Sequence, residues 1–229
     1  MIDLVAELDA LLVTWRARRT TPTAALIDEL SSWFALALPA IPGRTRTERH
    51  RSWLARGTKH VAVELPGLLA TVAQSTASDT TKQLEVLAEW PSDPRMTWLA
   101  RRLYQTKPFA TSSGDQKVWR RLFHLLEVHA DPRALAVIDA SSMAKVFDAT
   151  ERGRAMRERA KSIVTRIEMH DVELTADDRV AHDARAARLA AALESGRALR
   201  DAVRLEEDDE HQPSRLVYLD WLMERGYVL

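Results

Sequence analysis

Residues 84–95 and 122–133 of this chain align with each other at a constant offset of 38 positions. Each stretch has the pattern of an apolar helix end, a short loop and then Asp-Pro-Arg, at 93–95 and 131–133. Asp can accept a hydrogen bond from an unpaired N–H in the first turn of the next helix, where Pro is tolerated. A helix pair repeated at this period is typical of stacked α-helical arrays, which usually present a surface rather than a reaction centre.

The composition agrees with a helical fold. Ala, Leu, Arg and Glu dominate the 229 residues, only seven Gly and nine Pro are present, and runs of alternating β-branched residues are missing. The sequence therefore predicts an all-α protein with HEAT-like helix pairs over residues 1–140 and a second helical region over 141–229.

Several classes of protein are disfavoured. The chain has no cysteine, which excludes disulfides and thiolate metal sites, and a cytoplasmic protein is the simplest expectation. Neither a signal peptide nor an apolar run of about 20 residues is seen, so we expect no membrane partner. The 33 acidic and 33 basic residues balance, so only a local patch could attract a nucleic acid.

The periodicity predicts the course of the helices. Apolar stripes place helices near residues 4–15, 22–38, 48–56, 65–73, 80–90, 94–104, 115–128 and 132–140. A long, charged helix is expected over 143–169 with an interruption at Gly153, and an Ala-rich helix is expected to end before Gly196. A last helix over 213–225 carries apolar residues nearly all round, so we expect burial on more than one side.

That last helix contains a recognisable pattern. Residues 215–226 read Arg-Leu-Val-Tyr-Leu-Asp-Trp-Leu-Met-Glu-Arg-Gly, and the segment from about 197 to 229 resembles the bacterial repeat-companion domain, a short helical module found beside repeat arrays. Leu219 replaces the small residue usual before Asp, and the chain stops at residue 229, whereas members commonly continue. The resemblance implies a bacterial protein and no particular chemistry. Arg215 and Asp220 could hydrogen-bond across the module.

No catalytic or cofactor pattern stands out. The seven histidines are scattered without an i, i+4 pair, the acidic run 206–210 lacks the alternating spacing of a calcium loop, and neither a nucleophile elbow nor a phosphate-binding loop is present. The sequence thus predicts a non-enzyme without metal or cofactor. A hydrolase with two carboxylates converging in a pocket is a third hypothesis that the sequence cannot address.

The favoured function is an adaptor or scaffold that binds another protein. Trp98 falls beside the apolar stripe of its helix and is the best candidate for an exposed interface residue, although burial between repeats is the competing interpretation. Arg95 and Arg133, which follow the two junction prolines, are the accompanying candidates.

The alternative is nucleic-acid binding, in a HEAT-like DNA-binding mode, through the basic segment 44–60, in which Glu48 is the only acid. Cations could neutralise phosphates while an indole stacks on a base. The candidate residues are Arg44, Arg46, Arg49, Arg51, Trp53, Arg56 and Lys59.

Overall fold

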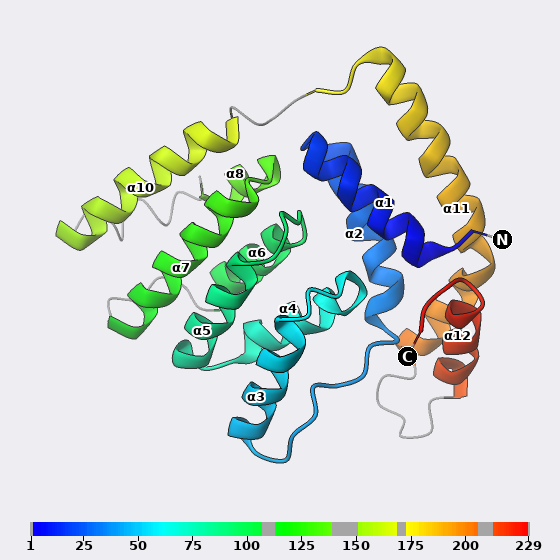
Figure 1. The fold of residues 1–229 in the computed structure, drawn as a ribbon, viewed down its shortest axis with the longest axis horizontal. Helices are drawn as coiled ribbons and strands as arrows, with labels where there is room; N and C mark the ends of the chain where they lie inside the picture. Colours follow the sequence, from blue (N-terminus) through cyan, green and yellow to red (C-terminus); the bar gives the residue numbers. More distant parts are fainter. Residues whose placement is uncertain (1, 107–112, 139–150, 169–172, 206–212, 229) are drawn as a thin grey trace.

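The computed structural model describes residues 2–106, 113–138, 151–168, 173–205 and 213–228 (Figure 1). Across these ranges the regular structure is helical and no strand occurs, which confirms the predicted all-α class. None of the helices in the same ranges combines the length and apolar character that a bilayer crossing requires. The acidic run 206–210 and the start of the helix predicted over 143–169 lie outside the described residues.

Most of the helices alternate between two rows. The first row consists of α3 (Arg46–Gly57), α5 (Ala77–Ala88), α7 (Ser113–His129) and α10 (Glu151–Glu168). The second consists of α4 (Leu65–Gln74), α6 (Met96–Thr106) and α8 (Leu135–Ile138), and the 3₁₀ turns η1 (Ala62–Glu64) and η2 (Pro132–Ala134) precede α4 and α8. Each helix contacts the next one in its own row, so successive helix pairs lie side by side (Figure 1).

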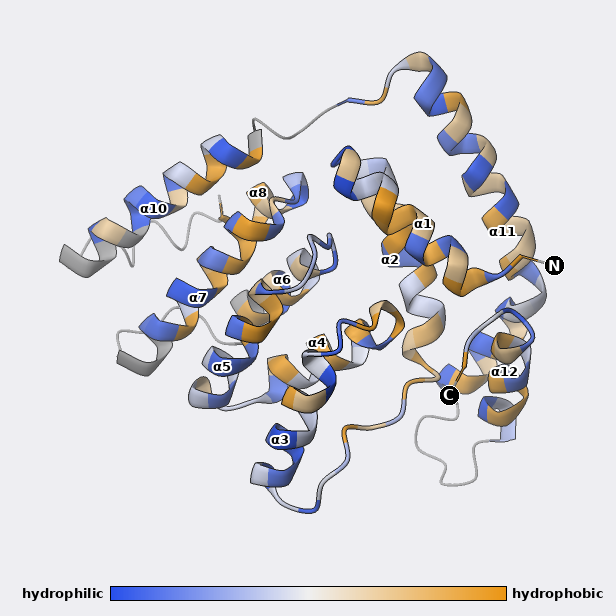
Figure 2. Ribbon diagram, in the orientation of Figure 1, coloured by the Kyte–Doolittle hydropathy of each residue, from blue (hydrophilic) through white to orange (hydrophobic). Residues whose placement is uncertain are grey.

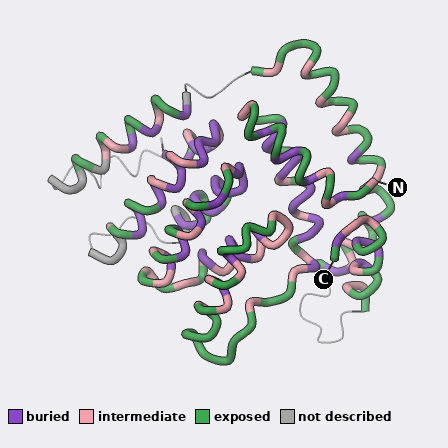
Figure 3. Tube along the Cα trace, in the orientation of Figure 1, coloured by how far each residue is buried: buried purple, intermediate pink, exposed green. Residues whose placement is uncertain are grey.

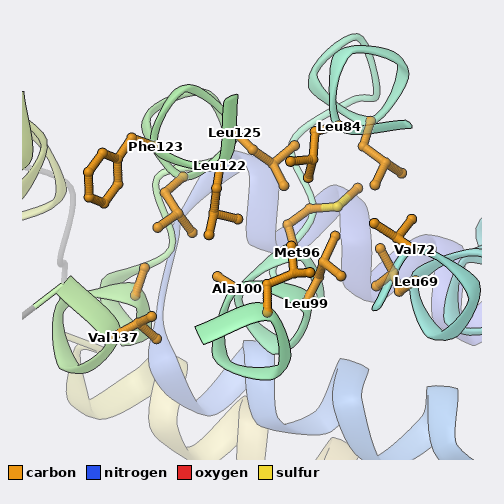
Figure 4. Close-up of a cluster of buried hydrophobic side chains, with 14 of the residues drawn as sticks. Leu69, Val72, Leu84, Met96, Leu99, Ala100, Leu122, Phe123, Leu125 and Val137 are labelled. Carbon is orange, nitrogen blue, oxygen red and sulfur yellow. The ribbon is translucent and has the colours of Figure 1, made fainter. Parts of the chain in front are cut away.

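The first apolar core lies between the two rows. Leu84, Leu122 and Leu125 from α5 and α7 face Met96 and Leu99 from α6, and all of them are buried (Figure 4). The apolar stripes that predicted these helices are the faces that meet here, whereas hydrophilic residues predominate on α3 and on the outer side of α10 (Figure 2). Burial of this seam is the main favourable contribution to stacking.

A second core joins the two ends of the chain. Helices α1 (Leu4–Ala17) and α2 (Thr21–Ala35) pack with α11 (Ala176–Leu205) and α12 (Pro213–Met223), and their apolar side chains form one cluster. The predicted division at residue 140 falls outside the described residues. The buried clusters nevertheless group the chain differently from that division, because α1 and α2 share their core with α11 and α12, whereas α10 belongs to the core of α3–α8.

Two glycines expected to interrupt helices do not do so. Helix α10 continues through Gly153, and α11 runs for 30 residues through Gly196. Gly196 serves a packing purpose, because a Cβ atom there would lie 2.4 Å from Cζ2 of Trp221. The absence of a side chain lets α12 approach α11 closely, and the helix tolerates the modest loss of propensity.

Helix α12 is buried on one side only, so the expected burial on more than one side is wrong. Tyr218, Trp221 and Leu222 are buried, whereas Leu216 is 65% exposed. Figure 3 shows this mixture of buried and exposed stretches along α12. Gly226 follows α12 with a φ of +92°, a conformation that suits glycine. Three hydrogen bonds tie α12 and the residues after it to the N-terminal hairpin, which comprises α1, α2 and the residues up to Leu38. Arg215 donates to Leu38 O at 3.0 Å, the Tyr218 hydroxyl donates to Trp33 O, and Leu4 N donates to Arg225 O at 2.9 Å.

Candidate functional site

The first Asp-Pro-Arg junction is a buried ion pair. Asp93 Oδ1 accepts hydrogen bonds from the backbone N–H of Arg95 at 3.0 Å and from its Nε at 2.9 Å, and Oδ2 accepts from Nη2 at 2.6 Å. Arg95 is only 3% exposed, and its Nη1 donates to Ser31 Oγ at 3.1 Å and to Ala62 O at 2.8 Å. The guanidinium therefore joins the start of α6 to α2 and to η1.

The second junction repeats this geometry. Arg133 donates from its backbone N–H to Asp131 Oδ1 at 3.0 Å and from Nη2 to Asp131 Oδ2 at 2.8 Å. Its Nη1 pairs with Asp28 of α2, and Nη2 also donates to Pro94 O at 3.0 Å. Asp28 and Ser31 are three residues apart, so the two arginines meet one face of α2. The predicted Asp cap is confirmed at both junctions, and each arginine also reaches a neighbouring unit.

These contacts contradict the prediction that Arg95 and Arg133 bind a partner. Arg95 is buried, and the side chain of Arg133, 15% exposed, is held by two carboxylates. If such a guanidinium bound another protein instead, the buried carboxylate with which it pairs would be left without a counter-charge. Although burial opposes ionisation, the charge and hydrogen bonds of Arg95 hold the pKa of Asp93 below its usual value. The junction thus stays ionised near neutral pH.

A buried histidine joins the two junctions. His129 Nδ1 accepts a hydrogen bond from Asp93 N at 3.0 Å, and Nε2 lies 3.1 Å from Leu87 O. These contacts require the neutral ring, with its proton on Nε2. Burial lowers the pKa of His129 to about 4, against the effects of the Leu87 carbonyl and Asp93. The imidazole acts here as a structural bridge between α7, α5 and the Asp93 loop.

Trp98 lies on the opposite, solvent-facing side of the same helix start. It is 45% exposed, whereas each of the other six tryptophans is less than a tenth exposed. Arg101 and Arg102 follow it by three and four residues and are also exposed, so they share its face of α6. The backbone N–H of Trp98 donates to Arg95 O at 3.1 Å, so the buried arginine fixes the turn that carries the exposed indole.

The basic segment does not form the surface that its composition predicts. Trp53 is fully buried and donates from Nε1 to Leu68 O at 3.0 Å, so it cannot stack on a base. Arg46 pairs with Asp79 at 2.7 Å, and this hydrogen bond lowers the pKa of Asp79. Arg56 is half-buried. The exposed cations of the segment are Arg44, Arg46, Arg49, Arg51 and Lys59.

A cavity of about 370 Å³ between α1, α2 and α11 contains carboxylates, as the hydrolase hypothesis requires. However, Glu7 pairs with Arg185, and Asp178 pairs with Arg18. The pKa of Asp178 is lowered by hydrogen bonds from Thr175 and Arg18, whereas a general acid needs a raised pKa. Among the described residues, no three histidine or carboxylate side chains gather as a metal site would require.

Sequence reasoning missed the residues that complete the junctions. Asp28 and Ser31 lie on α2, 105 and 64 positions from the arginines that they contact. His129 is one of the scattered histidines of the sequence, and its place just before the second Asp-Pro-Arg is the signal that could identify it. Comparison with known proteins adds no relative: no family model, curated protein or solved structure matches this chain.

Proposed function

We propose that the protein is a non-catalytic adaptor that binds another protein through the exposed face of α6. Under this proposal the two rows of helices are a HEAT-like repeat array, and the C-terminal segment is a repeat-companion module that covers the N-terminal hairpin. The matching junctions at 93–95 and 131–133 support the first part. The left-handed conformation of Gly226, three residues after the end of α12, is what a module ending in Glu-Arg-Gly would need and supports the second.

The observation that carries the proposal is the exposure of Trp98. An indole placed in water loses the favourable burial that the other six tryptophans gain, and tryptophan is enriched at the centres of protein interfaces. The position is also rigid, because Leu99 and Leu103 of the same helix are buried in the core. A rigid aromatic residue binds with a small loss of conformational entropy.

The basic residues beside Trp98 indicate the charge expected on the surface of the partner. Arg101 is exposed on the same face of α6 and forms no ion pair with a described side chain. We therefore propose a partner segment with an apolar pocket for the indole and acidic side chains beside it. Opposite charges at the rim accelerate association and set specificity. The expectation of a bacterial, cytoplasmic setting belongs to the same proposal.

The test is affinity capture from the native host followed by mass spectrometry, with wild type, Trp98→Ala, Arg101→Glu and Val180→Ala run in parallel. Val180 is a matched control, since it is a large apolar residue, 71% exposed on α11. A protein that is captured by wild type and Val180→Ala and lost with Trp98→Ala and Arg101→Glu would support the surface. Identical sets of captured proteins for all four baits would overturn it.

Nucleic-acid binding is the weaker candidate. The burial of Trp53 removes the proposed stacking residue, and the contacts of Arg46 with Asp79 and Thr76 use its guanidinium inside the protein. A salt-dependent shift of labelled DNA or RNA that disappears with Arg49→Glu and Arg51→Glu together would restore this candidate.

A further inference from the structure

A second cavity lies between α3, α4 and the N-terminal half of α5. Its volume is about 460 Å³, within the range of small-molecule sites. The wall carries Arg46, Arg49, His50, Asp79 and Gln83, and Ile41 adds an apolar edge. Neither the exposed face of α6 nor the Asp-Pro-Arg junctions contribute to it.

Two side chains of this wall carry buried polar atoms without hydrogen-bond partners among the described residues. Gln83 is only 1% exposed, and its Oε1 is buried without a donor. Both ring nitrogens of His50 are likewise buried without a hydrogen bond, and Nδ1 lies 3.8 Å from Asp79 Oδ1. An unsatisfied buried polar atom is unfavourable, so such atoms in a cavity wall are positions that a ligand could complete.

The charges of the wall favour an anion. Asp79 is the one acid of this wall, and Arg46 already neutralises it through a hydrogen bond of 2.7 Å. Arg49 donates only to the carbonyl oxygens of Gly43 and Arg44, at 3.4 and 3.5 Å, so its charge is not neutralised by these contacts. A guanidinium in this position can bind the oxygens of a phosphate or carboxylate in bidentate fashion.

We propose that this cavity binds a small hydroxylated oxyanion, with Arg49 and His50 on the phosphate or carboxylate group and Gln83 Oε1 accepting a hydrogen bond from a hydroxyl. The depth of Gln83 determines the class of ligand. A nucleic-acid backbone could place a phosphate against Arg49, but only a small molecule can enter far enough to reach a side chain that is 1% exposed.

The test titrates the full chain with glycerol 3-phosphate, which combines both groups, and with sulfate, which carries no hydroxyl, by isothermal titration calorimetry. We expect saturable binding of glycerol 3-phosphate, tighter than that of sulfate. Arg49→Gln should weaken both ligands about tenfold or more, as expected for a lost charge-assisted hydrogen bond. Arg51→Gln is the matched control, because Arg51 is an exposed arginine of α3 that does not line the cavity.

Gln83→Leu distinguishes recognition of the hydroxyl group from recognition of the anionic group. It should weaken glycerol 3-phosphate about fivefold and leave sulfate unchanged. If this buried change disrupts folding, as judged by circular dichroism, the comparison of Arg49→Gln with Arg51→Gln still decides. Three results would overturn the proposal: no saturable binding at millimolar glycerol 3-phosphate, equal weakening by both arginine variants, or stronger binding of an oligothymidylate that Arg51→Gln abolishes.

Discussion

Arg133 donates a hydrogen bond of 3.0 Å to the carbonyl oxygen of Pro94, the proline that holds the corresponding position one unit earlier. Arg95 makes the same kind of contact with Ala62 O at 2.8 Å, and Ala62 begins η1 before α4 as Pro132 begins η2 before α8. Each arginine therefore links its own junction to the preceding one. These links explain why Arg recurs after the proline without serving a ligand.

Removing one member of the buried ion pair should destabilise the protein strongly. Arg95→Met leaves Asp93 as an uncompensated buried carboxylate, so we expect the free energy of unfolding to fall by about 3–5 kcal/mol in chemical denaturation. Arg197→Met is the control, because its pair with Glu194 is half-exposed and should be worth about 0.5 kcal/mol. Similar losses for the two variants would show that Arg95 is not in a buried pair.

The pKa of His129 predicts a dependence of stability on pH. In the unfolded chain the imidazole of His129 takes up a proton near pH 6.5, whereas in the folded protein it does so only near pH 4. The unfolded state therefore binds more protons between these values, and stability falls as the pH decreases through this window. The loss is about 1.4 kcal/mol for each pH unit, or about 3 kcal/mol in total.

His129→Gln, which takes up no proton, should flatten this part of the curve of unfolding free energy against pH. His124→Gln, on the partly exposed side of α7, serves as the control and should leave the slope unchanged. An unaltered slope in His129→Gln would contradict the bridging role.

The close approach of Trp221 to Gly196 predicts that alanine at position 196 lowers the stability of the protein. In a solvated helix Gly→Ala is stabilising by up to about 1 kcal/mol. In α11 the new Cβ would collide with Trp221 at 2.4 Å, so we expect Gly196→Ala to destabilise by about 1–3 kcal/mol in thermal unfolding. Gly67→Ala is the matched control, because its Cβ would meet only the flexible Leu38 side chain, at 3.2 Å. Equal changes in thermal stability for Gly196→Ala and Gly67→Ala would contradict a close contact between Gly196 and Trp221.

The distribution of tryptophans predicts how fluorescence is quenched. Acrylamide should reach Trp98 readily and the six buried indoles poorly, so Trp98→Phe should remove most of the accessible fraction in a quenching titration. Trp15→Phe, at a fully buried position, should leave that fraction nearly unchanged. Equal accessible fractions in wild type and Trp98→Phe would show that this indole is covered.

Local patterns were sufficient for the helices and for the two junctions. The caps by Asp93 and Asp131 follow from short-range rules, because donor and acceptor are two residues apart. The exposed side of Trp98 could also be inferred from its place beside an apolar stripe. These features depend on neighbours within one helix turn.

Features set by distant neighbours could not be predicted. Gly196 resembles a helix breaker until Trp221, 25 positions later, is known to lie against it. Leu216 and Val217 are apolar yet exposed, because the N-terminal hairpin covers only the side of α12 that carries Tyr218 and Leu222. Trp53 belongs to a basic stretch but faces the core. The basic composition of this stretch does not show which of its side chains face inward, because only the periodicity of apolar residues identifies a buried face.

The most direct test of the proposed function is hydroxyl-radical footprinting of the free protein and of its complex with the captured partner. The proposal predicts that the oxidation rate of Trp98 falls several-fold in the complex while that of Met223, exposed on α12, stays the same. An unchanged rate at Trp98 in a saturated complex would contradict the assignment of α6 as the binding surface.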